Sequence, residues 1–341
     1  MIAPARRGDR KGAEVVMRCA ILDDYQNAAL AMADWGPVAG DLDVLVFADH
    51  VSDEDALAQR LAGFAIVVIM RERTPFPRTL FEKLPDLKLL VTTGSSNPSI
   101  DLVAAADHGV VSCGTGSLDH PTAELTWGLI IALLRCIPLE DANLRVGGAW
   151  QRSVGVDLKG RTLGIIGLGK LGIQSARIAR AFGMEVLAWS QNLTARRCLD
   201  VGATLASKDT LLGRADVVTV HTNLSRRTVG LIGRREFALM KPTAYLINTS
   251  RGPIVDEAAL IEALRNRTIA GAALDVFDCE PLADDHPLRN LDNTVLTPHL
   301  GYVSEDNYRV FYGLAVEVIR AWLDGAPIRI LRAEDQLDRS R

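Results

Sequence analysis

The stretch Arg161-Thr162-Leu163-Gly164-Ile165-Ile166-Gly167-Leu168-Gly169-Lys170-Leu171-Gly172 decides the fold of this chain. An apolar strand-like run leads into the spacing G-x-G-x-x-G, a helical pattern follows, and the next strand-like run is Met184–Trp189. In this setting the glycines allow a tight turn, close approach of a pyrophosphate, and close packing of helix on strand. The amino terminus of the helix adds free N–H groups and partial positive charge. The stretch therefore predicts a dinucleotide-binding βαβ unit.

The choice of dinucleotide depends on the end of the second strand of this unit. An NAD site normally has Asp or Glu about 20 residues after the first glycine, bonded to the ribose 2′-hydroxyl. Ser190 occupies that place, so no carboxylate repels a 2′-phosphate, and Arg196 and Arg197 follow shortly. The sequence therefore permits NADP as well as NAD. Both arginines also fit a solvated helix face, so the choice of cofactor stays open.

A similar alternation of short apolar runs and helical patterns precedes this unit. Candidate strands are Cys19–Leu22, Val44–Phe47, Ala65–Ile69, Lys88–Val91 and Val110–Cys113, with candidate helices starting near Glu54, Arg78 and Asp101. Such alternation predicts a parallel sheet covered by helices, and 341 residues suit about two domains. We therefore expect an α/β fold with two lobes. The apolar helix predicted at 121–134 is expected between domains or at a subunit interface, and residues 307–323 predict a final amphipathic helix.

The bulk composition excludes several classes of protein. Apolar residues make up 48% and charged residues 23%, with a net charge of −4 and a pI near 5.9, so the basic excess of a nucleic-acid surface is missing. The longest apolar stretches are far shorter than the ~20 residues that span a bilayer. Five scattered cysteines without CxxC spacing favour a reducing compartment over disulfides or a zinc site. We expect a cytoplasmic protein without nucleic-acid, membrane or metal partners.

The first 16 residues differ from the rest of the chain. They carry basic side chains but lack the hydrophobic region of roughly 7–15 residues that a secretory signal needs. A strand-like pattern begins only at Met17. We expect residues 1–16 to form a loosely held extension.

Three charged residues, Arg251, Glu280 and His299, each follow an apolar strand-like run. The carboxyl ends of parallel strands open onto one crevice, which is where ligands bind. We therefore expect a guanidinium, a carboxylate and an imidazole to share one pocket. The three runs are 244–248, 271–277 and 293–296.

These groups suit hydride transfer to a 2-keto acid. Arg251 offers a planar fork for a carboxylate, although a structural salt bridge is an equal alternative for this residue alone. An imidazole ordinarily titrates near pH 6.5, and a carboxylate such as Glu280 beside His299 favours the charged ring and keeps a proton available for a substrate oxygen. For His221 a cofactor contact and a core position stay equally open. Structural or exposed positions are expected for His50, His108, His120 and His286.

From about Met17 to about Leu323 the chain resembles the D-isomer-specific 2-hydroxyacid dehydrogenase family. The motifs that carry the resemblance are Leu158–Gly169, Leu246–Gly252, Ala273–Phe277 and Thr297–Gly301. The resemblance implies NAD(P)-dependent interconversion of a 2-keto acid and a D-2-hydroxy acid. It also implies a Rossmann-type doubly wound parallel sheet at 121–299, a smaller flavodoxin-like substrate domain at 17–120 and 300–330, and a homodimer formed through the dinucleotide-binding domain.

The resemblance also implies a role for individual residues. The family's catalytic groups fall on Arg251, Glu280 and His299. Its cofactor contacts, beside the loop glycines Gly167, Gly169 and Gly172, fall on Lys170, Leu171, Ser190, Thr249, Ser250 and Asp275. Its substrate contacts fall on Arg71, Arg73, Thr93, Gly94 and Ser95. Many members continue the second substrate loop as G-x-G-x-D, whereas this chain has Asn97-Pro98-Ser99-Ile100-Asp101, so the identity of the substrate stays open.

Two alternatives use the same scaffold. One is a dinucleotide-sensing binding protein, like the family members that act as transcriptional corepressors, and the presence of all three reactive residues disfavours it. The other is a formate dehydrogenase, which avoids a His–Glu pair because formate oxidation moves a hydride without a proton relay. Glu280 argues against that second alternative.

Overall fold

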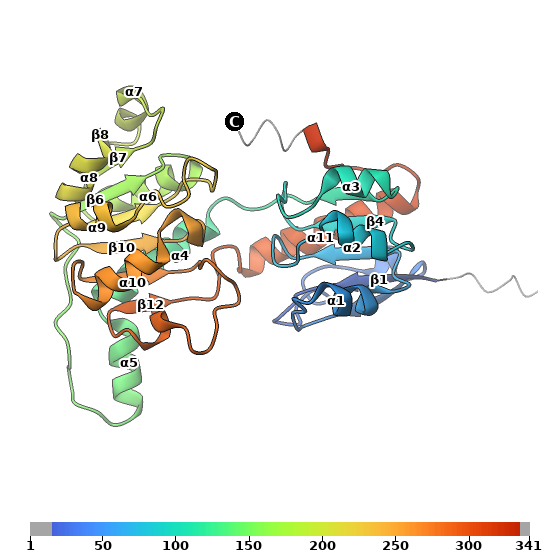
Figure 1. Ribbon diagram of the computed structural model, residues 1–341, viewed down its shortest axis with the longest axis horizontal. Coiled ribbons are helices and arrows are strands. Elements are labelled where there is room, and N and C mark those ends of the chain that lie inside the picture. The colour runs from blue at the N-terminus through green and yellow to red at the C-terminus, as the bar shows by residue number, and fades with distance from the viewer. Residues whose placement is uncertain (1–15, 335–341) are drawn as a thin grey trace, which may run out of the picture. The chain divides into compact units, whose positions relative to one another are not determined.

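The computed structural model describes residues 16–334, so the extension expected at residues 1–16 lies outside the described residues except for Val16. The chain forms two compact units. Unit 1 contains the described residues up to Ser117 and those from Glu305 onward, and unit 2 contains Leu118–Ser304. Each unit has its own sheet with helices packed against it (Figure 1). Every strand pairing in both sheets is parallel, which confirms the predicted α/β fold.

Unit 1 contains a five-stranded sheet with the order β2-β1-β3-β4-β5. This is the flavodoxin-like order, and its topological switch point lies between β1 and β3. The strands are β1 (Met17–Ile21), β2 (Leu42–Val46), β3 (Ile66–Ile69), β4 (Leu89–Thr92) and β5 (Val111–Gly114). The helices are α1 (Glu54–Leu61), α2 (Arg78–Lys83), α3 (Leu102–Asp107) and α11 (Glu305–Leu323), with a 3-10 turn at Gly36–Val38.

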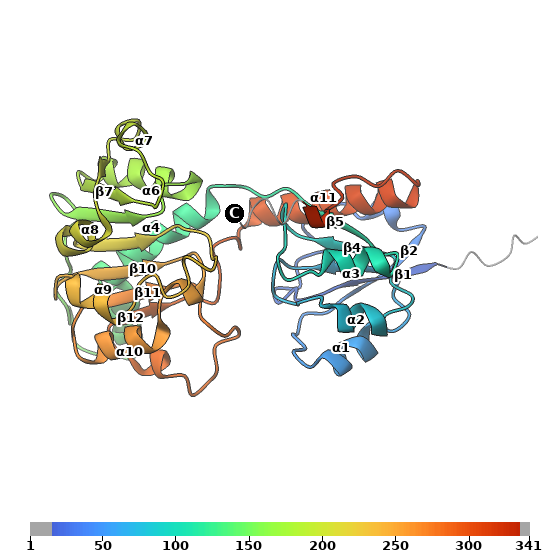
Figure 2. The same ribbon diagram turned by 45° about the horizontal axis from the view of Figure 1, so that its top comes forward.

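The central strands β3 and β4 of unit 1 are buried because helices cover both faces of the sheet. Val67 and Ile69 of β3 belong to a core that also contains residues of α1, α2 and α3. Figure 2 shows α11 on the side of the sheet opposite to α1 and α2. Asp53 and Asp101 cap α1 and α3 by accepting hydrogen bonds of 2.8 Å from backbone N–H groups in the first turn. These caps explain why both helices start where the sequence predicts.

Unit 2 contains a seven-stranded sheet with the order β12-β11-β10-β9-β6-β7-β8. From β6 the order runs to β7 and β8 on one side and to β9 on the other, so β6 and β9 flank the switch point. The strands are β6 (Thr162–Ile166), β7 (Glu185–Trp189), β8 (Thr204–Leu205), β9 (Val217–Val220), β10 (Tyr245–Asn248), β11 (Gly271–Leu274) and β12 (Thr294–Leu296). The helices are α4 (Pro121–Leu134), α5 (Ile137–Arg145), α6 (Lys170–Ala181), α7 (Ala195–Leu199), α8 (Lys208–Arg214), α9 (Arg234–Leu239) and α10 (Glu257–Arg265), with 3-10 turns at Gly252–Ile254 and Pro287–Asn290.

The helix predicted from Pro121 packs against the sheet of unit 2. Trp127, Leu129 and Ile130 of α4 are buried in a core with residues of β6 and β7. No single helix within residues 16–334 is long and apolar enough to cross a membrane. Helices α4 and α5 reach that length and apolar character only when they are taken together, and the pair is bent by 63°. The bend follows from Cys136, which adopts a left-handed conformation with φ of 54° between the two helices.

Two predicted boundaries differ from the structure. The strand predicted at 271–277 ends at Leu274, because the buried Asp275 turns its carboxylate to the loop after β12. Glu280 therefore lies on a loop six residues past the strand and not at its end. The final helix begins at Glu305, two residues before the predicted start. The remaining predicted strands agree with the structure to within two residues.

Candidate active site and dinucleotide site

The glycine loop of unit 2 has a separate requirement at each glycine. Gly167 has φ of +100°, which L side chains rarely adopt, and a Cβ there would lie 2.7 Å from the carbonyl atoms of His221. A Cβ on Gly172 would overlap the carbonyl oxygen of Gly167. The absence of a side chain at Gly172 therefore allows α6 to pack directly against the glycine turn. A Cβ on Gly169 would meet nothing within 4 Å. A turn, a packing contact and an open approach are the three features that a pyrophosphate loop needs.

The amino terminus of α6 supplies polar groups beside this open approach. Gly169 caps the helix without a side-chain hydrogen bond, and the first N–H groups of a helix have no partner inside it. They carry partial positive charge that favours an anion. Lys170 and Leu171 are the first residues of the helix, and Lys170 is exposed. These residues fit a pyrophosphate and would hold it through backbone N–H groups.

Ser190 lies beside the glycine turn. Its Oγ accepts a hydrogen bond of 3.2 Å from the backbone N–H of Leu168, which ties the end of β7 to the turn. No acidic residue occurs from Ser190 to Leu199. Arg196 is on α7, largely exposed, and 3.5 Å from Asp200. The ribose end of the predicted site is therefore polar and free of carboxylates up to Asp200.

His299 and Glu280 form a close pair in unit 2. His299 Nδ1 lies 2.6 Å from Glu280 Oε2, and Glu280 Oε1 accepts a hydrogen bond of 2.9 Å from the backbone N–H of Phe277. Burial opposes ionisation of Glu280, but the hydrogen bond and charge of His299, together with the charge of Arg251, bring the pKa of the Glu280 carboxyl below its ordinary value. Both side chains stay partly exposed, so the pair is accessible to a ligand.

Arg251 follows β10, as the sequence predicts. Its Nη1 donates a hydrogen bond of 2.7 Å to the carbonyl oxygen of Ser250, and its charge acts on Glu280. Nearby, Ser250 Oγ donates to the carbonyl oxygen of Val220 at 3.2 Å, and the buried Thr249 shares a hydrogen bond of 2.8 Å with Thr126. Thr249 and Ser250 therefore link the ends of β9 and β10 with α4. The three reactive groups belong to one electrostatic cluster.

Asp275 organises the loop that carries His299. Its Oδ1 accepts hydrogen bonds from Thr297 Oγ1 at 2.6 Å and from the backbone N–H of Leu300 at 2.7 Å, and its Oδ2 accepts one from the N–H of Gly301 at 2.8 Å. Burial raises the pKa of Asp275, against the effect of these donors and of His299. His299 sits within this loop at φ of 54°, an unusual conformation for a non-glycine residue. The predicted contact of Asp275 with a nicotinamide amide stays a prediction.

The structure places His221 in the core beneath the glycine loop. Its Nε2 lies 3.1 Å from Ser175 Oγ and 3.1 Å from Thr219 Oγ1, and burial lowers its pKa to about 4. The imidazole is therefore neutral near pH 7. Its Nδ1 is buried and has no hydrogen-bond partner within the described residues.

The two predicted substrate loops lie side by side in unit 1. The backbone N–H of Arg71 donates to Thr93 Oγ1 at 2.9 Å, and a Cβ on Gly94 would overlap the Arg71 guanidinium. Arg73 Nη1 donates to the carbonyl oxygen of Asp23 at 2.7 Å. Arg71, Arg73, Thr93 and Gly94 thus form one group, at the ends of β3 and β4.

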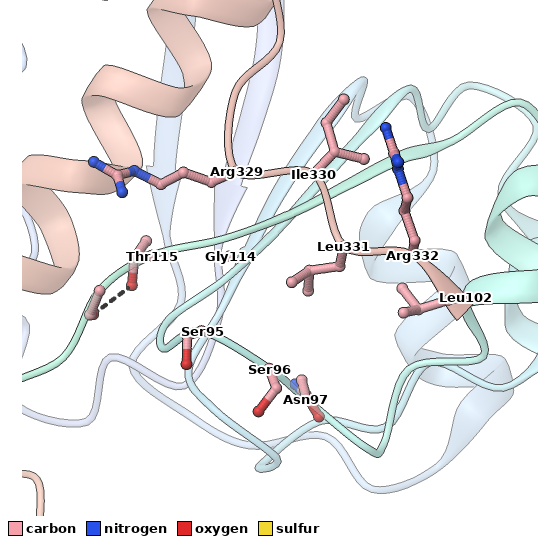
Figure 3. A pocket seen from close by; sticks show the side chains of 11 residues that line it. Ser95, Ser96, Asn97, Leu102, Gly114, Thr115, Arg329, Ile330, Leu331 and Arg332 are labelled. Carbon is pink, nitrogen blue, oxygen red and sulfur yellow. Dashed lines mark hydrogen bonds between the residues drawn. The ribbon is translucent and has the colours of Figure 1, made fainter. Parts of the chain in front are cut away.

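Ser95 faces a different feature of unit 1. A cavity of about 330 Å³ lies between the loop after β4 and the segment Arg329–Arg332 (Figure 3). Ser95, Ser96 and Asn97 line one wall, and Leu331 points into the cavity from the other, whereas the guanidinium groups of Arg329 and Arg332 extend away from it. The segment is held by backbone hydrogen bonds from Leu331 to Ser112 and from Gly114 to Arg329, of 2.8 and 3.0 Å.

Two contacts, one in each unit, are absent from the predicted set. The ring of Tyr302 meets the imidazole of His299 edge-on, with centroids 5.3 Å apart. Asn97 reaches from the second substrate loop to the backbone of Arg71 at 2.7 Å. Tyr302 lies only three residues after His299, and this short spacing could have indicated a contact between the two rings. Asn97 occupies a position where many family members have a glycine-rich run, and this difference could have drawn attention to its side chain.

Residues 16–334 contain neither a cluster of metal-ligating side chains nor a disulfide bond. No group of three or more His, Cys, Asp or Glu side chains in this range is placed to hold a metal ion. All five cysteines are free thiols, and burial raises the pKa of Cys19 to about 12 and of Cys113 to about 11.

Fold and site together define a dinucleotide-binding α/β protein with an arginine, a glutamate and a histidine clustered beyond the sheet. Residues 127–301 match the family model described as D-isomer specific 2-hydroxyacid dehydrogenase, NAD binding domain. The chain belongs to the D-isomer specific 2-hydroxyacid dehydrogenase family, and unit 2 contains its NAD-binding domain. This confirms the resemblance inferred from the sequence motifs.

Named relatives agree with this assignment. The chain is 38% identical over 269 residues to the D-3-phosphoglycerate dehydrogenase of Bacillus subtilis, covering 76% of this chain and 50% of the relative. It is 37% identical over 255 residues to the glyoxylate reductase of Aeropyrum pernix, covering 72% and 76%. The chain thus spans about half the length of the phosphoglycerate dehydrogenases that it matches.

A solved structure gives the same result for the fold. The phosphoglycerate oxidoreductase of Vibrio cholerae O395 superposes with a TM-score of 0.87 at 36% identity, covering 91% of this chain and all of that chain. The matched proteins described here are dehydrogenases, reductases and oxidoreductases. They do not favour the corepressor-like alternative.

The glycine loop yields a paired prediction. Gly169→Val places a side chain in the open approach, so the melting temperature should change by less than ~2 °C while dinucleotide affinity falls at least ~10-fold. Gly172→Val should instead lower the melting temperature, because its side chain overlaps the turn. Thermal unfolding and nucleotide titration by fluorescence measure both effects. Unchanged affinity in Gly169→Val would contradict the assignment of the loop.

Proposed function

We propose that the protein is an NAD(P)-dependent oxidoreductase that interconverts a 2-keto acid and a D-2-hydroxy acid by hydride transfer. The observation that carries the proposal is the 2.6 Å contact between His299 Nδ1 and Glu280 Oε2, with the charge of Arg251 acting on the same carboxylate. A histidine paired in this way can act as a general acid–base group, and a guanidinium can bind a carboxylate. Membership of the family supports the same reaction.

Each reactive side chain has a distinct task in this proposal. Arg251 binds the substrate carboxylate and polarises the keto group. A bound reduced nicotinamide supplies the hydride that the carbonyl carbon accepts. His299 donates a proton from Nε2 to the oxygen that gains negative charge, since Nδ1 is held by Glu280. Glu280 keeps the ring oriented through its contact with Nδ1. In the oxidative direction the neutral ring removes the hydroxyl proton.

The acid–base pair gives the second prediction. His299→Ala should lower kcat for keto-acid reduction at least ~100-fold, because the substitution removes the proposed proton donor. Glu280→Gln should lower kcat less, by ~10-fold, because the imidazole stays in place but loses the charged partner that holds Nδ1. Steady-state rates from pH 5 to 9 measure both effects.

Two results would contradict these roles. Near-normal turnover in His299→Ala would exclude the histidine as proton donor, and unchanged turnover in Glu280→Gln would exclude the glutamate as its partner. Nucleotide titration is the control, since both variants should keep dinucleotide affinity within about threefold of the wild type, a general acid acting on the chemical step and not on cofactor binding.

We also propose that the cofactor site accepts NADPH as well as NADH. The carboxylate that normally contacts the ribose 2′-hydroxyl is replaced by Ser190, whose hydroxyl is bonded to the glycine turn. Arg196 and Arg197 lie on the short helix that follows. A 2′-phosphate therefore meets no like charge at the end of β7.

Substitution at Ser190 tests this cofactor preference. Ser190→Asp should lower kcat/KM for NADPH at least ~10-fold more than for NADH, because an acidic side chain repels the 2′-phosphate and binds the 2′-hydroxyl. Ser190→Ala removes the hydroxyl without adding charge and is the matched control. This variant should keep the wild-type ratio of kcat/KM for NADPH to kcat/KM for NADH. An equal loss with both cofactors in Ser190→Asp would exclude this place as the ribose contact.

The protein is further proposed to form a homodimer through unit 2. Apolar side chains gather on α5 and the segment after it, which project from the rest of the unit in Figure 1. Their exposed fractions are 50% for Ile137, 58% for Leu144, 82% for Val146, 79% for Trp150 and 96% for Val154. Exposed apolar surface of this kind marks a partner site, and the partner proposed here is a second copy of the chain.

Charge substitution in this segment tests the dimer. The double variant Val146→Glu/Trp150→Glu should sediment as a monomer at micromolar concentration, because two charges cannot be buried unpaired in an apolar contact. Val103→Glu, at an apolar residue of α3 that is 54% exposed, is the matched control and should leave the mass unchanged. A wild-type protein that is already monomeric would refute the proposal.

The proposed setting of this activity is the cytoplasm, with a small 2-keto or 2-hydroxy acid as the reaction partner. The five free thiols are compatible with a reducing compartment. Cell fractionation followed by immunoblotting tests the location, and recovery with an extracellular fraction would contradict it.

A further inference from the structure

The cavity in unit 1 is not used by any step of the proposed reaction. It lies between the loop after β4 and the segment Arg329–Arg332, and every residue that lines it belongs to unit 1 (Figure 3). Its volume of about 330 Å³ falls at the lower end of the roughly 300–1,000 Å³ of small-molecule sites. The cavity is therefore large enough to hold a small ligand.

Small residues keep this space open. A Cβ on Gly114 would lie 2.7 Å from the carbonyl oxygen of Gly94 and 3.2 Å from Leu331 Cδ2, so no side chain fits there without displacing its neighbours. Ser95 and Ser96 extend from the loop after β4 with only short side chains. The cavity is thus bordered by residues that leave room beside Leu331.

One wall of the cavity offers hydroxyl groups to a ligand. In the part of the chain that the structure describes, neither Ser95 nor Ser96 has a side-chain hydrogen bond to another residue. Each hydroxyl can both donate and accept a hydrogen bond. Thr115 Oγ1, by contrast, already accepts from the N–H of Gly94 at 2.7 Å and donates to the carbonyl oxygen of Gly116 at 3.0 Å. The two serine hydroxyls are therefore the groups available to a ligand.

The opposite wall is aliphatic. Leu331 points into the cavity, and Leu102 of α3 and Ile330 also line it (Figure 3). Ile330 is 41% exposed, so part of this apolar surface is in contact with solvent. A ligand that covers these side chains removes apolar area from water, which favours binding. This wall therefore suits an aliphatic group.

The charged side chains at the cavity do not face it. Arg329 and Arg332 extend their guanidinium groups away from the cavity (Figure 3), and Arg329 Nη2 lies 3.5 Å from Glu317 Oε2. The described residues that line the cavity include no acidic side chain. A charged ligand of either sign would lose water without gaining an ionic partner, which costs far more than transfer of a neutral polar group. The cavity therefore disfavours ions.

We propose that this cavity is a binding site for a small neutral molecule that carries an amide or hydroxyl group on a short aliphatic chain. The polar group of the ligand bonds to Ser95 and Ser96, and its aliphatic chain packs on Leu331. The site is independent of the proposed reaction, since it requires neither a dinucleotide nor a keto acid.

Such a ligand also holds the segment 329–332 on the sheet. The backbone N–H of Leu331 donates to Ser112 at 2.8 Å, and that of Gly114 donates to Arg329 at 3.0 Å. These bonds attach the segment to the edge strand β5. A ligand that binds only the attached segment stabilises it against local opening. The N–H groups of the segment should therefore exchange more slowly with solvent when the site is filled.

Three probes of similar size test the preference for a neutral ligand. 3-Methylbutanamide carries a neutral polar group, whereas 3-methylbutanoate and 3-methylbutylammonium carry a charge in its place. Hydrogen–deuterium exchange of the full chain is measured with each probe at the same millimolar concentration. The amide should slow exchange of residues 329–332 at least ~3-fold, and neither ion should slow it measurably. No protection by the amide, or equal protection by an ion, would overturn the inference.

Filling the cavity tests where the amide binds. Ser96→Trp adds a large side chain to the wall of the cavity, so the ratio of exchange rates without and with the amide should fall to one. Ser99→Trp is the matched control, because Ser99 lies on the same loop but does not line the cavity, and this variant should keep the wild-type ratio. Full protection by the amide in Ser96→Trp would contradict the proposed site.

Removal of the hydroxyl groups gives a second, milder test. The double variant Ser95→Ala/Ser96→Ala adds no volume and remains usable if Ser96→Trp folds poorly, which thermal unfolding reveals. The amide concentration that gives half of the maximal protection should rise at least ~3-fold, because the polar group of the ligand loses its hydrogen bonds. An unchanged concentration would refute the assigned role of the two serines.

Discussion

The active-site geometry of unit 2 depends on one buried carboxylate. Asp275 receives three hydrogen bonds from the loop that contains His299, and it lies directly after β11, a rigid strand in the interior of the sheet. The loop thereby keeps a histidine in a left-handed conformation that it would not adopt alone. Glu280 is anchored separately, through the N–H of Phe277. The 2.6 Å contact between the two catalytic candidates follows from these two anchors.

The fold was predictable because parallel strands leave a strong pattern in the sequence. Strands such as β3 and β4 are buried on both faces, so they appear as continuous apolar runs between helical patterns. Asp53 and Asp101 mark helix starts through their capping hydrogen bonds. The glycine loop was predictable for a related reason, since backbone atoms exclude a side chain at Gly167 and Gly172, and Gly169 borders open space. These signals are local, and a sequence displays local signals directly.

The clustering of Arg251, Glu280 and His299 was predictable only in outline. Parallel sheets bring the ends of strands together, so three residues after three strands were expected to meet. The sequence could not show that β11 stops at Leu274, because the reason is a long-range hydrogen bond from the loop after β12. The contact of Asn97 with Arg71 is of the same kind, spanning 26 residues. Such contacts depend on loop conformation, for which periodicity carries no information.

The anchoring of the imidazole on one side has a consequence for chirality. Because Nδ1 is engaged with Glu280, the ring can address a ligand oxygen only through Nε2, along one direction. In the proposed reaction, the guanidinium of Arg251 holds the neighbouring carboxylate and fixes a second direction. A planar keto carbon with its oxygen and its carboxylate both fixed can expose only one of its two prochiral faces to a hydride donor. Fixing these two directions is enough for the proposed reaction to yield a single enantiomer.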